Sequence, residues 1–226
     1  MIVVVTGTGT GVGKTRLAAA LVHALAARGP VIGWKPVESG VTGASGDLGE
    51  DEAALAQASA VHVPSMRLRA PLSPHLAARR EGVTIDAAAL HTRFAELATA
   101  WATLVVEPAG GLCSPLDDEL DNAAWLAGAP AIVRADYRLV LVAPDRLGVL
   151  HDVTAALHAA AAHALPVAAI ALAPVTSPDL STGTNAAELA TRPLTRTIPI
   201  ISIPHASITD LATSPAVHAL IAALRG

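Results

Sequence analysis

The stretch IVVVTGTGTGVGKT at residues 2–15 decides the fold of this chain. Residues 2–6 form an apolar, β-branched run that predicts a buried strand. The loop that follows has a glycine at every second position, ends in GKT, and leads into an Ala- and Leu-rich segment that predicts a helix over 14–28. Glycines let backbone N–H groups turn inward, and a helix N-terminus adds the positive end of its dipole. The stretch therefore indicates a phosphate-binding loop between a strand and a helix.

The two residues that close this loop suit a nucleoside triphosphate. We expect Lys14 to reach the outer phosphates and the hydroxyl of Thr15 to lie on Mg²⁺. The strict phosphate-loop pattern requires a glycine at position 8, where this chain has threonine. The dinucleotide pattern G-x-G-x-x-G fails in either register, which argues against a nicotinamide or flavin cofactor. Partition ATPases carry a signature lysine early in this loop, where this chain has Gly9, so that class is disfavoured.

Length and composition fit one α/β domain. The chain has 226 residues, of which 52% are hydrophobic and only 2% aromatic, so its core must be built from Ala, Val, Leu and Ile. Short apolar runs alternate with longer Ala-rich segments, which is typical of a mostly parallel sheet flanked by helices on both faces. We find neither repeats nor a linker, and we expect a single P-loop NTPase-like domain over residues 1–226.

The element boundaries follow from the same patterns. Strands are predicted at 2–6, 31–35, 103–107, 138–143, 167–173 and 199–203. Helices are predicted at 14–28, 50–59, 86–101, 121–128, 148–164, 184–190 and 214–224. Three stretches fit neither pattern. Residues 38–49 are rich in Gly and Ser and are predicted to form a mobile loop. Residues 62–84 are predicted to be an extended excursion, and residues 174–183 a further loop.

Charge, cysteine content and hydropathy disfavour several classes of protein. The net charge is −4 without a cluster of basic residues, so nothing points to nucleic acid as a partner. Cys113 is the only cysteine, which excludes an internal disulfide and disfavours a cysteine-based metal site. The N-terminus lacks the basic segment of a signal peptide, and the longest apolar region, around 153–175, is interrupted by two histidines and Pro166. We therefore expect a cytoplasmic protein without a membrane span.

Only two of the 15 basic residues are lysines, and both lie in site-like stretches. Lys14 closes the phosphate loop, and Lys35 in WKPVESG ends the second predicted strand. Glu107 in LVVEPAGG ends the third. Ligands bind at the carboxyl edge of the strands in open α/β sheets. A carboxylate at that edge suits Mg²⁺, which takes oxygen ligands and usually keeps one or two carboxylates.

Other acidic residues have competing interpretations. Asp51 in GEDEAALAQ is a candidate metal ligand, but it can also be a charge that favours the N-terminal dipole of a helix. Glu50 and Glu52 compete with it for any metal role. Asp121 is predicted to cap the helix at 121–128.

Together these segments resemble dethiobiotin synthetase, the ATP-dependent enzyme family that closes the ureido ring in biotin synthesis. The resemblance rests on GTGTGVGKT at 7–15, KPVESG at 35–40, SPHLAARREG at 73–82, VVEPAGGLCSPL at 105–116 and RLGVL at 146–150. It spans most of the chain in order and in spacing, and the offset of the first glycine in the phosphate loop is itself a trait of that family.

The resemblance implies a homodimer that acts on small molecules, namely 7,8-diaminopelargonate, CO₂ and Mg-ATP. By similarity, one amine takes up CO₂ as a carbamate, which ATP phosphorylates. The second amine attacks the mixed anhydride, closes the ring and releases phosphate.

The same resemblance implies roles for particular residues. Catalytic roles fall on Lys14, Lys35 and Thr10, where the two lysines would hold the carbamate and the γ-phosphate. The Mg²⁺ ligands would be Thr15, Asp51 and Glu107. Nucleotide binding would fall on Gly9, Gly11, Val12, Gly13, Lys14, Thr15, Arg16, Pro174 and Pro204. Substrate binding would fall on Thr10, Lys35, Ser39, Gly110, Leu147, Gly148, Val149 and Leu150, the last four in a segment that resembles the one reaching the neighbouring subunit's substrate.

Three positions depart from the family pattern. Pro108 follows Glu107 where the family usually has glycine, and proline removes an N–H donor. Gly11 stands where many members have glutamate. Many members also read adenine with an Asn-Asp pair, and this chain has Ala173-Pro174 there. We therefore expect base recognition by backbone groups around 174–176 and 203–206, and weak discrimination between nucleotides.

Two alternatives from other classes stay open at this point. One is another P-loop enzyme that activates a carboxylate, such as an amidoligase of the cobyrinate type. Those enzymes usually carry a glutaminase domain with a reactive cysteine, for which this chain is too short. The other is a non-catalytic nucleotide-dependent switch of the partition ATPase type, which would hydrolyse ATP in response to a partner protein or DNA.

Overall fold

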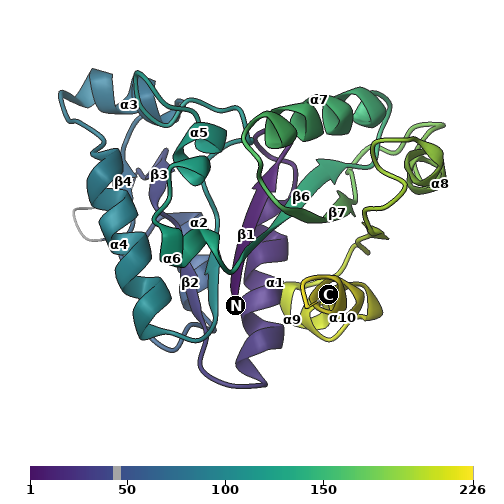
Figure 1. The fold of residues 1–226 in the computed structure, drawn as a ribbon, viewed down its shortest axis with the longest axis horizontal. Helices are drawn as coiled ribbons and strands as arrows, with labels where there is room; N and C mark the ends of the chain where they lie inside the picture. Colours follow the sequence, from purple (N-terminus) through teal and green to yellow (C-terminus); the bar gives the residue numbers. More distant parts are fainter. Residues whose placement is uncertain (43–46, 226) are drawn as a thin grey trace.

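A six-stranded, entirely parallel sheet forms the centre of the molecule in a computed structural model that describes residues 1–42 and 47–225 (Figure 1). The strand order is β2-β5-β1-β6-β7-β8, and each adjacent pair runs parallel. The strands are β1 (Ile2–Gly7), β2 (Ile32–Trp34), β5 (Leu104–Val106), β6 (Tyr137–Pro144), β7 (Val167–Ala173) and β8 (Ile200–Ser202). All six were predicted from the sequence, to within one residue at each end.

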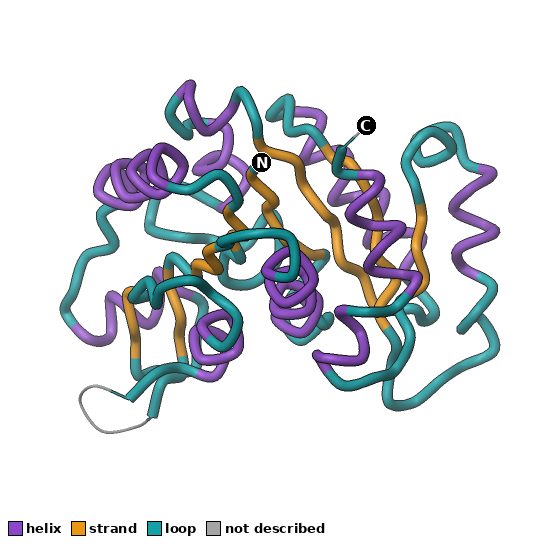
Figure 2. Tube along the Cα trace, turned by 90° about the horizontal axis from the view of Figure 1, so that it is seen from below, coloured by secondary structure: helices purple, strands orange, loops and turns teal. Residues whose placement is uncertain are grey.

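Helices cover both faces of this sheet, as predicted (Figures 1 and 2). They are α1 (Lys14–Ala26), α2 (Glu50–Ala56), α3 (Pro74–Glu81), α4 (Ala87–Ala100), α5 (Asn122–Ala127), α6 (Ala131–Arg134), α7 (Val149–Ala162), α8 (Asn185–Thr191), α9 (Ile208–Ala212) and α10 (Pro215–Ala223). The side chains of β1 alternate between the two faces because successive residues of a strand point in opposite directions. Val3 and Val5 pack with α1, α9 and α10, whereas Ile2 and Val4 belong to the cluster that contains Phe94 of α4.

The prediction for residues 62–84 was wrong, because this segment contains a strand and a helix. Met66–Leu68 form β4, which pairs in parallel with β3 (Val37–Ser39) in a second, two-stranded sheet. Helix α3 follows, with Pro74 in its first turn and Gly82 at its C-terminus in the left-handed conformation, φ 67°. These are ordinary start and stop signals of a helix.

The loop predicted at 38–49 begins later than expected, because β3 extends through Ser39. Residues 43–46 of that prediction lie outside the described residues. The loop predicted at 174–183 is confirmed, since it contains only turns and irregular backbone. The helices α6 and α9 were not predicted.

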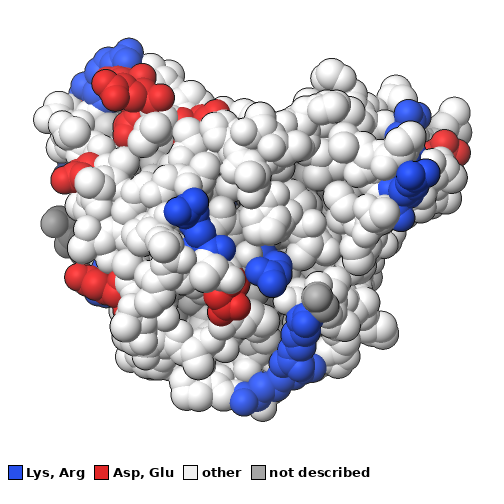
Figure 3. Space-filling model, viewed as in Figure 1, with Lys and Arg blue, Asp and Glu red and all other residues white. Residues whose placement is uncertain are grey.

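No helix within residues 1–42 and 47–225 is long and apolar enough to cross a membrane. On the face shown in Figure 3, basic side chains form small separate groups and most of the surface carries no charge.

Candidate active site

The loop between β1 and α1 has the backbone shape that its glycines allow. Gly13 precedes α1 with φ 95°, a left-handed conformation that side chains other than glycine rarely adopt. A Cβ on Gly7 would lie 2.8 Å from Cγ2 of the buried Val12. The loop is fixed to its neighbours because the Thr8 N–H donates to the carbonyl of Val142 at 2.9 Å, and the Leu112 N–H donates to that of Gly7 at 2.8 Å.

A cavity of about 660 Å³ opens beside this loop, at the carboxyl edge of the sheet. Its walls come from the phosphate loop, the segment around β3, the first turn of α2, the start of α3 and the loop after β5. The residues that line it are Thr10, Gly11, Gly13, Lys14, Thr15, Arg16, Lys35, Glu38, Ser39, Asp51, Pro71, Leu72, Ser73, Pro74, Glu107, Ala109, Gly110 and Ser114. The structure thus brings together most of the predicted site residues from four separate stretches of sequence.

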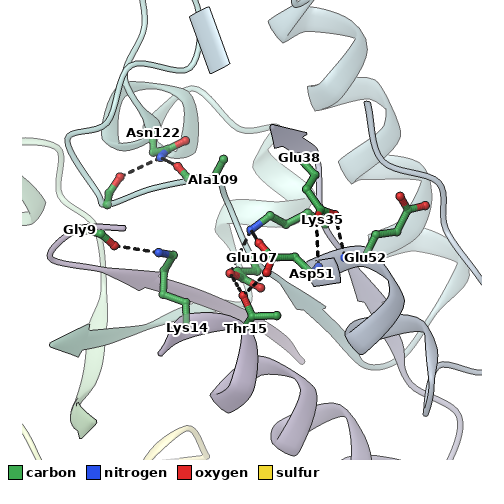
Figure 4. A network of polar contacts seen from close by, with 11 residues as sticks. Gly9, Lys14, Thr15, Lys35, Glu38, Asp51, Glu52, Glu107, Ala109 and Asn122 are labelled. Carbon is green, nitrogen blue, oxygen red and sulfur yellow. Dashed lines mark hydrogen bonds and ion pairs between the residues drawn. The ribbon is translucent and has the colours of Figure 1, made fainter. Parts of the chain in front are cut away.

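The three predicted metal ligands meet on one side of this cavity (Figure 4). The Thr15 Oγ1 lies 2.6 Å from Oδ1 of Asp51 and 2.8 Å from Oε1 of Glu107. Thr15 comes from α1, Asp51 from α2, and Glu107 directly follows β5. The Glu107 N–H still donates to the carbonyl of Trp34 at 3.0 Å, so Pro108 does not detach this residue from the sheet.

Both predicted lysines are buried at the same place (Figure 4). The Nζ of Lys35 lies 2.6 Å from Oδ2 of Asp51 and 3.0 Å from Oε1 of Glu107. The Nζ of Lys14 donates to the carbonyl of Gly9 at 2.8 Å, within its own loop. Lys35 is therefore held between two carboxylates, whereas within the described part of the chain Lys14 bonds only a backbone carbonyl of the loop that would receive phosphate.

Burial and charge act on these groups in different directions. Burial lowers the pKa of Lys14, and the nearby charge of Lys35 adds to this effect while Glu107 opposes it. Burial also acts to lower the pKa of Lys35, but Glu107 and Asp51 outweigh it, so the pKa is raised. Lys35 thus remains a fixed cation.

The carboxylates respond in opposite ways. Burial raises the pKa of Glu107, although Lys35 opposes this. Burial acts in the same sense on Asp51, but the charge of Lys35 and the hydrogen bonds from Lys35 and Thr15 leave its pKa below the ordinary value. The two carboxylates of the cluster therefore differ in how readily they ionise.

The oxygen atoms of this cluster fit a divalent cation. A hydroxyl carries one proton, so Thr15 donates to only one of its two carboxylate neighbours at a time. The Oε2 of Glu107 is buried and has no hydrogen-bond partner among the described residues. A hydroxyl and two carboxylates are oxygen ligands of the kind that Mg²⁺ prefers, and a cation among them would satisfy these atoms together.

The neighbouring acids of α2 do not compete with Asp51. Glu52 is 2% exposed and receives two hydrogen bonds from the Arg67 guanidinium, at 2.6 and 2.7 Å, and its Oε1 lies 2.6 Å from Nε2 of His62. Glu50 is exposed and does not line the cavity. Asp51 is the residue of the three that reaches Thr15 and Lys35.

Two polar residues that sequence analysis missed shape the walls of the site. Glu38, from β3, accepts the backbone N–H groups of Asp51 and Glu52 (Figure 4). Asn122 is buried, and its Nδ2 donates to the carbonyls of Ala109 and Gly111 at 2.7 and 2.8 Å, which fixes the loop after β5. Asn122 directly follows Asp121, the predicted helix cap, which accepts the N–H of Ala124. The sequence therefore marked this helix start but not the inward role of Asn122.

Other predicted residues lie in different surroundings. Ser39 lines the cavity, and its hydroxyl is buried without a partner among the described residues. Arg16 lines both this cavity and a second one of about 40 Å³. That second cavity is otherwise lined by Gly13, Leu17, Val142, Ala173, Pro174, Ile203 and Leu211. Pro204 is exposed next to Ile203 and is not part of this lining.

The segment 147–150 does not line the large cavity of its own chain. Leu147 is 75% exposed, whereas Val149 is buried and Leu150 packs against the same core cluster beside β6 and β7. Gly148 precedes α7 with φ 96°. The segment therefore offers an exposed leucine and backbone groups to the outside of the molecule.

Comparison with known proteins gives consistent results. A model of the AAA domain family matches residues 2–211. ATP-dependent dethiobiotin synthetase BioD of Nitrosospira multiformis is 37% identical over 170 residues, covering 73% of this chain and 71% of that protein. The BioD protein of Caulobacter sp. strain K31 is 41% identical over 191 residues, covering 78% and 77%.

A similar solved structure is that of a ParA family ATPase from Chlorobium tepidum. It covers 100% of this chain and 97% of its own, with a TM-score of 0.57 and 13% identity. At this identity the likeness shows a shared P-loop NTPase fold alone.

Proposed function

The chain belongs to the family of ATP-dependent dethiobiotin synthetases, and from this membership we propose that it carboxylates 7,8-diaminopelargonate and closes its ureido ring to give dethiobiotin, ADP and phosphate. The observation that carries the proposal is the meeting of Thr15, Asp51, Glu107 and Lys35 in one cavity beside Lys14. Membership favours this ligase reaction over a switch of the partition ATPase type.

In the proposed reaction, the nucleotide lies with its phosphates on the β1–α1 loop. Gly9, Gly11, Val12 and Gly13 give that loop its shape, and the N-terminus of α1 favours the phosphate charge. Lys14 exchanges the carbonyl of Gly9 for a phosphate oxygen. Mg²⁺ would be held by Thr15, Asp51 and Glu107. When bound, it would neutralise part of the negative charge of the triphosphate.

The substrate diamine occupies the rest of the large cavity, against Thr10, Ser39 and Gly110. One amine adds to CO₂ and loses a proton to give a carbamate. A carbamate oxygen attacks the γ-phosphorus, and the bond between that phosphorus and the bridging oxygen of ADP breaks. Lys14 and Lys35 stabilise the charge that develops on the transferring group, because fixed cations need no reorganisation during the reaction.

The second amine then attacks the carbonyl carbon of the mixed anhydride. The carbon–oxygen bond to phosphate breaks, the attacking nitrogen loses a proton, and the five-membered ureido ring closes. The carbamate oxygen that attacked ATP leaves in the phosphate. Carbamate formation and phosphorylation use one amine, but ring closure needs a second amine on the same substrate, so the complete reaction requires a diamine.

We also propose that the active form is a homodimer. The exposed Leu147 and the backbone of 148–150 do not reach the cavity of their own chain, which suits a role at the substrate of a neighbouring subunit. In that arrangement the start of α7 would receive the carboxylate end of the substrate.

A coupled product assay tests the proposed function. Purified protein is incubated with ATP, Mg²⁺ and bicarbonate, with and without 7,8-diaminopelargonate, and dethiobiotin and ADP are measured by mass spectrometry. Dethiobiotin and ADP should form in equal amounts, and ADP release should depend on the diamine. The proposal would be refuted if ADP release did not depend on the diamine and was stimulated by DNA or by a partner protein.

A further inference from the structure

Glu38 is a buried carboxylate that binds backbone at the edge of the site (Figure 4). Its Oε1 accepts the N–H of Asp51 at 2.9 Å, and its Oε2 accepts the N–H of Glu52 at 2.9 Å. These are N–H groups of the first turn of α2, which have no partner inside the helix. A side chain from another element thus caps the helix at the residue whose own carboxylate enters the metal-binding cluster.

The residue before α2 is shaped by this contact. Gly49 has extended backbone, φ −66° and ψ 161°, which any residue can adopt. A Cβ at this position would nevertheless lie 2.1 to 2.3 Å from the carboxylate atoms of Glu38. The carboxylate therefore occupies the space that a side chain at position 49 would need, so glycine is required here for space and not for backbone conformation.

Glu38 also connects two parts of the cluster. Lys35 binds the side chain of Asp51, and Glu38, three residues later, binds its backbone. Both bonds come from the short segment that runs from the end of β2 into β3. Asp51 is consequently held at two points by one segment, whereas Glu50 beside it is exposed.

We propose that Glu38 is a positioning residue, which fixes the backbone of Asp51 so that its carboxylate meets Thr15 and Glu107. The proposal rests on the proposed function only for the identity of the cation that the cluster holds. Removing an outer partner of a metal ligand typically lowers metal affinity by about 10- to 100-fold. In the part of the chain that the structure describes, Glu38 makes no hydrogen bond to Thr15, Glu107 or Lys14, so it acts on the cluster through the backbone of Asp51.

Three variants test this role in the full chain. Glu38→Ala removes both acceptors, Glu38→Gln keeps one, and Gly49→Ala displaces the carboxylate without changing any charge. Asp86→Ala is the matched control, because Asp86 caps α4 through the N–H of Ala89, away from the cavity.

Two measurements apply to every variant, and neither requires turnover. Amide hydrogen exchange by NMR follows the N–H groups of Asp51 and Glu52 in the metal-free protein. Mn²⁺ binding by electron paramagnetic resonance, with the non-hydrolysable ATP analogue AMP-PNP present, reports on the cation site. AMP-PNP affinity without metal shows whether the phosphate loop is intact.

In Glu38→Ala and Gly49→Ala, the two amides should exchange at least about 10-fold faster and Mn²⁺ should bind at least about 10-fold more weakly. In Glu38→Gln, the exchange rates and the Mn²⁺ affinity should lie between those of these two variants and those of the wild type. The affinity for AMP-PNP without metal should stay unchanged in all three variants. Asp86→Ala should change none of these quantities. Unchanged amide exchange or unchanged Mn²⁺ affinity in both Glu38→Ala and Gly49→Ala would overturn the proposal. This result is distinct from failure of the proposed function, which would appear only in the product assay.

Discussion

The ammonium group of Lys35 lies 3.0 Å from the carboxylate of Glu107, and both side chains are buried, with exposed fractions of 3% and 0%. A second carboxylate, that of Asp51, lies 2.6 Å from the same nitrogen. Buried charges of this kind are costly unless they are paired. The pair therefore links the stability of the chain to the chemistry proposed for its site.

Lys35→Ala should impair both stability and turnover. Removing one partner of a buried pair leaves an uncompensated charge, so the free energy of unfolding should fall by about 3 kcal/mol or more. Turnover should fall at least about 10²-fold, because single electrostatic groups contribute that much to transfer reactions. Chemical denaturation and the product assay, at a temperature where both proteins are folded, measure the two effects.

The double variant Lys35→Ala/Glu107→Gln separates these effects. It should recover part of the lost stability because neither charge remains buried alone, and it should stay as inactive as the single variant. Near-wild-type turnover in Lys35→Ala would remove Lys35 from the mechanism.

Lys14→Ala should lower turnover with little change in stability. Among the described residues its ammonium group donates only to the carbonyl of Gly9. Burial disfavours the charged form of Lys14, so losing the cation offsets part of the lost hydrogen bond, and the net loss of stability should be about 1 kcal/mol. The turnover number should nevertheless fall at least about 10²-fold. Denaturation curves and turnover rates of the variant and the wild type measure the two effects. A loss of activity that is explained by a large loss of stability would contradict the assigned role of Lys14.

Discrimination between nucleotides should be weak. Among the described residues that line the small cavity beside the phosphate loop, Arg16 alone is charged, and the others are glycine and apolar residues such as Ala173, Pro174 and Ile203. Such residues offer few side-chain hydrogen bonds to a base. Turnover with CTP, GTP and UTP should lie within about 100-fold of that with ATP, or roughly 2.7 kcal/mol. A preference for ATP of more than about 100-fold would refute this prediction.

Glu52 should contribute to the pH dependence of stability. Although burial opposes it, hydrogen bonds from Arg67 and His62 lower the pKa of this carboxyl from 4.5 to about 2. A pKa that is lower in the folded than in the unfolded state stabilises the fold above pH 4.5, and this contribution is lost as the pH falls towards about 2. Glu52→Gln should lower the free energy of unfolding at pH 7 by about 2 kcal/mol.

The difference between this variant and the wild type should shrink between pH 4.5 and pH 2, as measured by denaturant titrations across that range. A difference that stays constant with pH would show that the Glu52 carboxylate does not carry the effect.

Much of the central sheet could be predicted because its strands are short apolar runs buried on both faces. Ala-rich segments between them gave the longer helices. The predictions failed where pairing depends on distant segments, as for the three-residue strands β3 and β4, whose paired residues Val37 and Met66 are far apart in sequence. Helix α3 buries Pro74, Ala77 and Ala78 but ends in three charged residues, so its apolar face is short, although Pro74 and Gly82 marked its ends.

In the candidate site, too, some residues could be predicted from the sequence and others could not. Lys14, Thr15, Lys35 and Glu107 could be predicted because each lies where a strand ends or a helix begins. Glu38 could not, since its function in the structure is to accept backbone N–H groups of a helix that follows in the chain, and sequence alone does not show which turn it faces. The segment 147–150 stays a prediction, because its proposed partner is a second subunit.

The fate of oxygen from CO₂ tests the central claim most directly. Purified protein is mixed with 7,8-diaminopelargonate, ATP, Mg²⁺ and freshly dissolved ¹⁸O-labelled CO₂, and the products are analysed by mass spectrometry before the label exchanges with water. Activation of a carbamate by the γ-phosphoryl group predicts dethiobiotin and ADP in equal amounts, with an oxygen of CO₂ transferred to the released phosphate. Hydrolysis of ATP without dethiobiotin, or dethiobiotin formed beside unlabelled phosphate, would contradict it.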